Sequence, residues 1–166
     1  MNEKIKFGNI GAITALIEEY EKSLNDLIDS ISDLSQEQLT EIIDFDTNDE
    51  DCKSIQNILA HVVQSGYNYV VEIRKYLGEE IEYKHKAKLS TIKDYKSALH
   101  EMFEFNEHLF VDYPNLELYE FEPNKKIFVR WGQKYDVEQL LEHAIVHLLR
   151  HRRQIEKFKE ILKASS

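Results

Sequence analysis

The sequence predicts an all-α protein, a four-helix up-and-down bundle with a small β-hairpin between its third and fourth helices. Its 166 residues are 42% hydrophobic, which is enough for one domain with a sizeable core. Only two prolines and five glycines interrupt it, which favours long elements. Along four segments the apolar residues recur at intervals of three and four, the spacing of a buried helix face. No repeat or linker divides the chain, so we expect one domain over residues 1–166.

The first helical segment has the pattern of a bundle seam, with charged residues between its apolar positions. Ser35 with Gln38 then resembles a capping box that opens a short helical turn through Ile43. The seam residues are Ile10, Ile13, Ile17, Tyr20, Leu24, Leu27, Ile31 and Leu34.

Three further helices follow from cap residues and periodicity. The second begins at the N-cap candidate Ser54 and ends at Gly78, and the third runs from Ser90 to just before Pro114. The fourth opens at Asp136, with Gln139 three residues on, and continues to about Ala164. If helix directions alternate, the second and fourth helices run parallel. The expected inward residues of the second are Ile55, Ile58, Leu59, Val62, Val63, Val70, Ile73 and Leu77, and those of the third are Ile92, Tyr95, Leu99, Met102, Phe103 and Phe110.

The hairpin is predicted from residues that alternate on either side of Pro123-Asn124. The phase of the alternation slips between Leu118 and Tyr119. The alternating residues are Leu116 and Leu118, then Tyr119 and Phe121, and beyond the turn Ile127, Val129 and Trp131.

Composition also limits the partners. The charge is 21 − 31 = −10, which argues against nucleic acid and anionic membranes as partners. The one basic cluster, Arg150, Arg152 and Arg153, is small. The single cysteine, Cys52, fits a reducing compartment, and neighbouring carboxylates disfavour its thiolate. The first seven residues lack an apolar signal core and no run of 18 apolar residues occurs, so we expect a cytoplasmic protein with no membrane partner.

Histidines are the one feature that points to chemistry. His143, His147 and His151 lie one helical turn apart, and His61 lies in an earlier helix. At about 100° per residue, His151 falls inside the apolar arc of the fourth helix, His147 about 20° outside it and His143 about 60° outside it. Gln154 projects close to His147, where it could orient a ligand.

Spacing alone leaves two interpretations open. A row of imidazoles suits zinc, nickel or iron, whereas a histidine at the edge of a core can simply be hydrogen-bonded. His61 lies about 60° beyond its apolar stripe, so periodicity does not place it in the core but allows a site at the lip of the bundle. His100, Glu104 and His108 also recur every four residues, but they project onto the solvated face, and His85 is expected in a surface loop.

Several familiar sites are absent from the sequence. There is no HExxH pair, no helical Glu-x-x-His pair, no glycine-rich phosphate loop, no Cys-x-x-Cys and no nucleophile elbow. These absences argue against zinc proteases of the usual type and against carboxylate-bridged di-iron bundles.

Two stretches, Ile58-Leu-Ala-His61-Val and His147-Leu-Leu-Arg-His151-Arg-Arg-Gln154-Ile155, resemble the DinB-like superfamily. This group of four-helix-bundle metalloenzymes includes bacillithiol S-transferases and mycothiol-dependent isomerases, and the likeness extends over nearly the whole chain. It implies metal ligands at His61, His147 and His151, with His143 as a non-ligand one turn earlier. Two positions differ from the family pattern: Arg153 stands where glycine is common, and Val146 where a polar residue is common.

The resemblance implies a metal-dependent enzyme, a thiol S-transferase or hydrolase that acts on a small molecule. The divalent ion would be zinc, nickel or iron, the partner a low-molecular-weight thiol, and the assembly a homodimer. Gln154 and His143 would lie just outside the ligands. The alternative is a non-catalytic metal-binding or dimerising stress-response bundle, in which a fourth protein ligand closes the site. A helical interaction module without metal is the third hypothesis.

Overall fold

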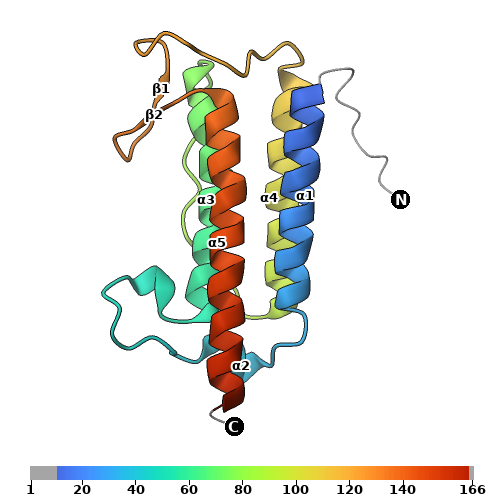
Figure 1. Cartoon of the computed structure of the whole chain (residues 1–166), viewed down its shortest axis with the longest axis vertical. Coiled ribbons are helices and arrows are strands. Elements are labelled where there is room, and N and C mark those ends of the chain that lie inside the picture. Colours follow the sequence, from blue (N-terminus) through green and yellow to red (C-terminus); the bar gives the residue numbers. More distant parts are fainter. Residues whose placement is uncertain (1–10, 165–166) are drawn as a thin grey trace.

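Four long helices pack side by side and a small hairpin lies beside one end of the bundle (Figure 1). The computed structural model describes residues 11–164, so the predicted seam residue Ile10 and the leading residues 1–7 lie outside the described part. The elements are α1 (Gly11–Ser30), α2 (Gln36–Thr40), the 3-10 helix η1 (Glu50–Cys52), α3 (Ile55–Tyr76), α4 (Ile92–Asp112), β1 (Ile127–Phe128), β2 (Lys134–Tyr135) and α5 (Val137–Ala164).

The predicted helix boundaries agree closely with the structure. Ser35 and Gln38 form the expected capping box, although α2 ends at Thr40, before Ile43. Ser54 accepts a hydrogen bond from the backbone of Asn57 and caps α3. Asp136 forms a second reciprocal pair with Gln139, which opens α5. Each cap supplies partners for backbone N–H groups that the first helical turn leaves unpaired.

The C-terminal end of α3 shows why Gly78 stands there. Gly78 has φ +95°, a left-handed conformation that glycine adopts without steric cost. Its N–H donates to the carbonyl of Lys75, and the N–H of Glu79 donates to that of Arg74, which is the Schellman arrangement. α4 begins one residue later than predicted, because Thr91 rather than Ser90 is the N-cap.

The core lies between the four long helices. All the predicted inward residues of the second and third helices are buried or half-buried, as are the described seam residues of the first, including Ile31 and Leu34 just beyond the end of α1. On α5 the apolar arc is buried throughout, which confirms the sequence projection. Its members are Leu140, Leu141, Ala144, Leu148, Ile155 and Phe158.

The helices do not alternate in direction, and this corrects the predicted arrangement. α3 and α4 run parallel: Tyr95 donates to the carbonyl of Gln56 near their N-termini (3.1 Å), and Arg74 pairs with Asp112 near their C-termini (2.7 Å). The connection over residues 77–91 causes this, because it runs back along the bundle instead of turning directly (Figure 1).

α5 is consequently antiparallel to α3, not parallel to it, and runs in the same direction as α1. Arg152 near the C-terminal half of α5 pairs with Asp26 near the end of α1. Lys159, two turns further on, donates to the carbonyl of Ser30, the last residue of α1. The sequence did not predict that residues 77–91 run back along the bundle, because they carry no helical or strand pattern that would indicate their course.

A hairpin does lie between α4 and α5, but its strands differ from the predicted ones. β1 pairs with β2 in antiparallel register, Ile127 opposite Tyr135. The turn lies at Gly132, which has φ +84°, and not at Pro123-Asn124. Residues 116–121 form no strand, because the carbonyl of buried Leu118 instead accepts from the N–H of Glu138 in the first turn of α5.

Close packing between α3 and α4 depends on Gly66. A Cβ placed on Gly66 would lie 1.7 Å from Sδ of Met102, which is fully buried. The same sulfur contacts the O–H of Tyr20 on α1 (3.8 Å), so three helices meet at this point. Met102 therefore cannot yield to a new methyl group without disturbing its neighbours.

Gly66→Ala is expected to lower the free energy of unfolding by about 1–3 kcal/mol, the usual effect of overpacking a core. Without the clash the same change would stabilise the helix by about 0.5–1 kcal/mol, so the sign of the effect is informative. Urea denaturation measures it, with Gly11→Ala as the control because no atom of residues 11–164 lies within 4 Å of that Cβ. A stabilised Gly66→Ala protein would contradict the packing described here.

Candidate metal centre

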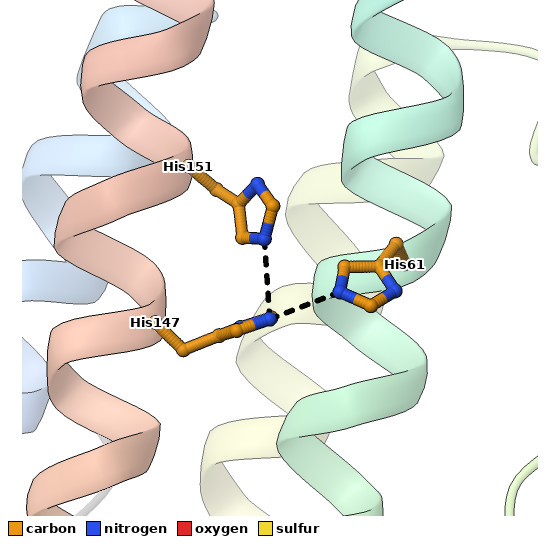
Figure 2. Close-up of side chains that lie close together, drawn as sticks. All are labelled: His61, His147 and His151. Atoms are coloured by element: carbon orange, nitrogen blue, oxygen red, sulfur yellow. Dashed lines mark hydrogen bonds between the residues drawn. The ribbon is translucent and has the colours of Figure 1, made fainter. Parts of the chain in front are cut away.

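Three imidazoles converge between α3 and α5 (Figure 2). Nε2 of His147 lies 2.9 Å from Nε2 of His61 and 3.1 Å from Nε2 of His151. Donor atoms of all three residues lie within 4.8 Å of one another, so the cluster could hold a metal ion. The antiparallel packing makes this meeting possible, because it brings the first half of α3 opposite the middle of α5.

The outer nitrogens of two of these rings have their own partners. Nδ1 of His61 lies 3.1 Å from a carboxylate oxygen of Asp51 on η1. Nδ1 of His151 lies 3.1 Å from the amide oxygen of Gln154, one turn further along α5. Both partners are acceptors, so each Nδ1 carries the proton and each Nε2 presents a lone pair to the centre of the cluster.

Protons alone cannot satisfy this arrangement. His147 can carry one proton on Nε2 and donate it to His61 or to His151, but not to both. The other lone pair would then lack a close donor, because the nearest one at His61, Oγ of Ser65, lies 3.5 Å from Nε2. A cation bound by all three lone pairs removes the conflict. Imidazoles that bind one ion at about 2.0–2.1 Å are about 3–3.4 Å apart, close to the two distances from His147. All three donor atoms lie within 4.8 Å of one another, so the rings of His61 and His151 would draw together around the ion. The donor set therefore fits a metal ion.

The site keeps its imidazoles neutral. Burial lowers the pKa of His147 to about 2, and the neighbouring His151 and His61 act in the same direction. Burial also lowers the pKa of His151 to about 4. The pKa of His61 is lowered by burial as well, against the opposing effect of the Asp51 and Asp49 carboxylates. Near pH 7 all three lone pairs are consequently available to a metal.

A cavity of about 360 Å³ opens beside His61 and His147. Tyr69 and His143 form part of its wall, and Arg130 and Trp131 in the turn of the β1–β2 hairpin form another part. The hairpin is fixed there, because Tyr135 contacts Nδ1 of His143 (3.0 Å) and the ring of Trp131 meets that of Tyr69 edge-on. The lining residues are His61, Ser65, Asn68, Tyr69, Arg130, Trp131, His143 and His147.

Comparison with known proteins places the chain in a family. The model of the DinB family matches residues 1–157. The chain belongs to the DinB family. This confirms the resemblance inferred from the histidine motifs. No curated protein and no solved structure gives a match.

In this DinB-family chain the structure brings together the residues that the sequence singled out. His61, His147 and His151 form the cluster, and Gln154 contacts His151 as the projection suggested. His143 lies outside the cluster and contacts Tyr135 and the ring of Tyr69. Whether these residues bind a metal stays a prediction.

Sequence reasoning missed Asp51 and most of the cavity wall. Asp51 lies in an acidic loop where spacing gives no indication of which carboxylate meets His61; it also pairs with Lys86. The wall residues that come from α3 do follow a recognisable pattern in the sequence. Ser65, Asn68 and Tyr69 follow His61 at intervals of four, seven and eight residues, which is one face of a helix.

The residues that were not predicted as metal ligands or nucleophiles are either exposed away from the cluster or poorly suited to these roles. His100, Glu104, His108 and His85 are exposed, as predicted. Burial raises the pKa of the Cys52 thiol, and the Asp49 carboxylate that it contacts acts in the same direction. Within residues 11–164, no helix combines the length and apolar character that a membrane crossing needs.

The lowered histidine pKa values predict a pH-dependent stability in protein freed of metal. Between the folded pKa values and the unfolded value of about 6.5, the unfolded chain binds protons that the folded chain does not. The free energy of unfolding should therefore fall as the pH drops below about 6.5, by up to about 1.4 kcal/mol per pH unit for each histidine. Urea denaturation between pH 7.5 and 5 measures the slope.

His147→Gln should reduce this slope, because it removes the most strongly shifted group. His100→Gln, which removes an exposed histidine of α4, is the control and should leave the slope unchanged. Equal slopes for the wild type and His147→Gln would contradict the burial of neutral imidazoles.

Proposed function

We propose that the chain binds one divalent metal ion through His61, His147 and His151. Three inward-facing lone pairs and the shortage of protons to bridge them support this assignment. Asp51 and Gln154 would fix the tautomers of His61 and His151 and so keep both Nε2 atoms aimed at the ion. The ion would be zinc, nickel or iron, the borderline metals that imidazole favours.

The bound ion would serve a metal-dependent enzyme, a thiol S-transferase or hydrolase that acts on a small molecule. When bound, the ion would supply Lewis acidity, which lowers the pKa of a thiol or water molecule that coordinates it. Among residues 11–164, the ligating cluster has three members and no fourth protein ligand to close it. The site is therefore suited to receiving a further molecule, which favours an enzyme over a structural metal.

The side chains around the ion would position the substrate rather than exchange protons with it. The cavity beside His61 and His147 would hold the small molecule, and its aromatic wall would exclude water. The side chain of His61 is 26% exposed, so the site also has a route to solvent. Among the described residues no carboxylate lines the cavity, and the one imidazole there outside the cluster, that of His143, contacts Tyr135 through Nδ1, so no general base is assigned.

Protein purified without chelators is expected to carry about one equivalent of metal per chain, because three histidines make one site. His147→Ala should lose it, since it removes the imidazole that contacts both others. Elemental analysis of the purified protein measures the content.

His143→Ala is the matched control: it removes a histidine one turn earlier on α5 that lies outside the cluster, and it should retain the metal. Metal at an unchanged trace level in the wild type and His147→Ala would reject the site.

Conjugation of a low-molecular-weight thiol to an electrophile is expected to depend on the metal. A chelator or His61→Ala should reduce the rate at least about a hundredfold, because the thiol would lose the ion that activates it. Bacillithiol or glutathione with a chlorodinitrobenzene electrophile gives a convenient absorbance assay. Activity that survives removal of the metal would contradict this mechanism, and metal binding without conjugation or hydrolysis would favour the non-catalytic bundle.

A further inference from the structure

We propose that the cavity beside the imidazoles binds a small organic carboxylate, with its anionic group held by Arg130 and its flat apolar part against Trp131. This inference rests on the proposed function, because His61 and His147 form the inner wall of the same cavity. It adds a substrate class to that function. Charge, the placement of Arg130 and the aromatic wall each support it.

The residues that line the cavity differ in charge from the chain as a whole. The chain contains 31 aspartates and glutamates, yet none of the eight described residues that line the cavity is acidic. Arg130 is the one lining residue whose side chain is charged at every physiological pH. An anion in this cavity can reach Arg130 directly, whereas the carboxylates that contact lining residues, Glu72 and Asp51, face the backbone N–H of Arg130 and Nδ1 of His61.

Two contacts fix Arg130, and neither uses the N–H donors at the edge of its guanidinium. The guanidinium carbon lies 4.3 Å from the centre of the Tyr83 ring, so one face of the group is stacked. The backbone N–H of Arg130 donates to the buried carboxylate of Glu72 on α3 (3.2 Å). A stacked guanidinium still presents N–H donors at its edge, in the fork that matches a carboxylate.

The remaining wall is aromatic, which favours an organic anion over an inorganic one. The rings of Trp131 and Tyr69 lie 5.7 Å apart, edge to face, and Trp131 also meets His143 at 6.1 Å. These rings offer apolar surface that phosphate or chloride cannot use. The volume of about 360 Å³ suits a molecule of roughly the size of a substituted benzoate.

Trp131 is the only tryptophan of the chain, so its fluorescence reports on this cavity. The experiment uses the full chain after treatment with a chelator, which removes any direct bond between a probe and a metal. Benzoate, its neutral analogue benzamide, and acetate, which lacks the ring, are titrated in turn. We expect benzoate to bind about tenfold or more tightly than either of the others, because only benzoate offers both the charge and the ring.

Arg130→Gln should weaken benzoate binding about tenfold and leave benzamide binding nearly unchanged. Arg130→Lys should keep part of the preference for benzoate, because it retains the charge without the fork. Lys134→Gln removes a positive charge from the same hairpin but not from the cavity, and it should bind benzoate as the wild type does. Thermal unfolding confirms that each variant is folded.

Equal affinity for benzoate and benzamide, or an Arg130→Gln protein that binds benzoate normally, would overturn the proposal. Acetate binding as tightly as benzoate would overturn the role of the aromatic wall. These results do not depend on metal content. A chain that binds no metal but prefers benzoate through Arg130 would refute the proposed metal enzyme and uphold the anion site. A chain that binds metal but shows no preference for benzoate would uphold the metal site and refute the anion site.

Discussion

The site depends on a shortage of protons among three imidazole nitrogens. Nε2 of His147 lies within hydrogen-bonding distance of Nε2 of His61 and of His151, but it can donate a proton to only one of them. Asp51 and Gln154 direct both flanking lone pairs inward, so His147 is left between two acceptors. A core would normally avoid such a contact, because unpaired polar groups in a buried place are costly. The contact becomes favourable when a cation occupies the space, which links the stability of this region to metal binding.

The relative direction of α3 and α5 allows the imidazoles of His61, His147 and His151 to meet. The return connection over residues 77–91 makes α3 and α4 parallel, and α5 then descends antiparallel to α3 (Figure 1). Asn68 holds this connection to α3, since its amide group donates to the carbonyl and accepts from the N–H of Lys84. The same helix presents Tyr69 to the cavity and Glu72 to the hairpin, so one face of α3 organises both the metal centre and the space beside it.

Local features of this fold could be predicted from the sequence, and its long-range arrangement could not. The caps at Ser35, Ser54 and Asp136 and the turn at Gly78 depend on residues a few positions apart, so their patterns are legible. The burial of His151 followed from helical periodicity for the same reason. The pairing of His61 with Asp51, the course of residues 77–91 and the partner of β1 depend on how distant segments pack, which periodicity does not encode. Only the family resemblance linked His61 to the histidines of α5 before the structure did.

A crystal structure of the protein grown with Zn²⁺, measured at the zinc absorption edge, tests the central claim most directly. The account predicts one strong anomalous peak between α3 and α5, about 2.0–2.1 Å from Nε2 of each of His61, His147 and His151. A zinc ion bound elsewhere, or a peak that touches the two histidines of α5 while the ring of His61 turns away, would contradict it.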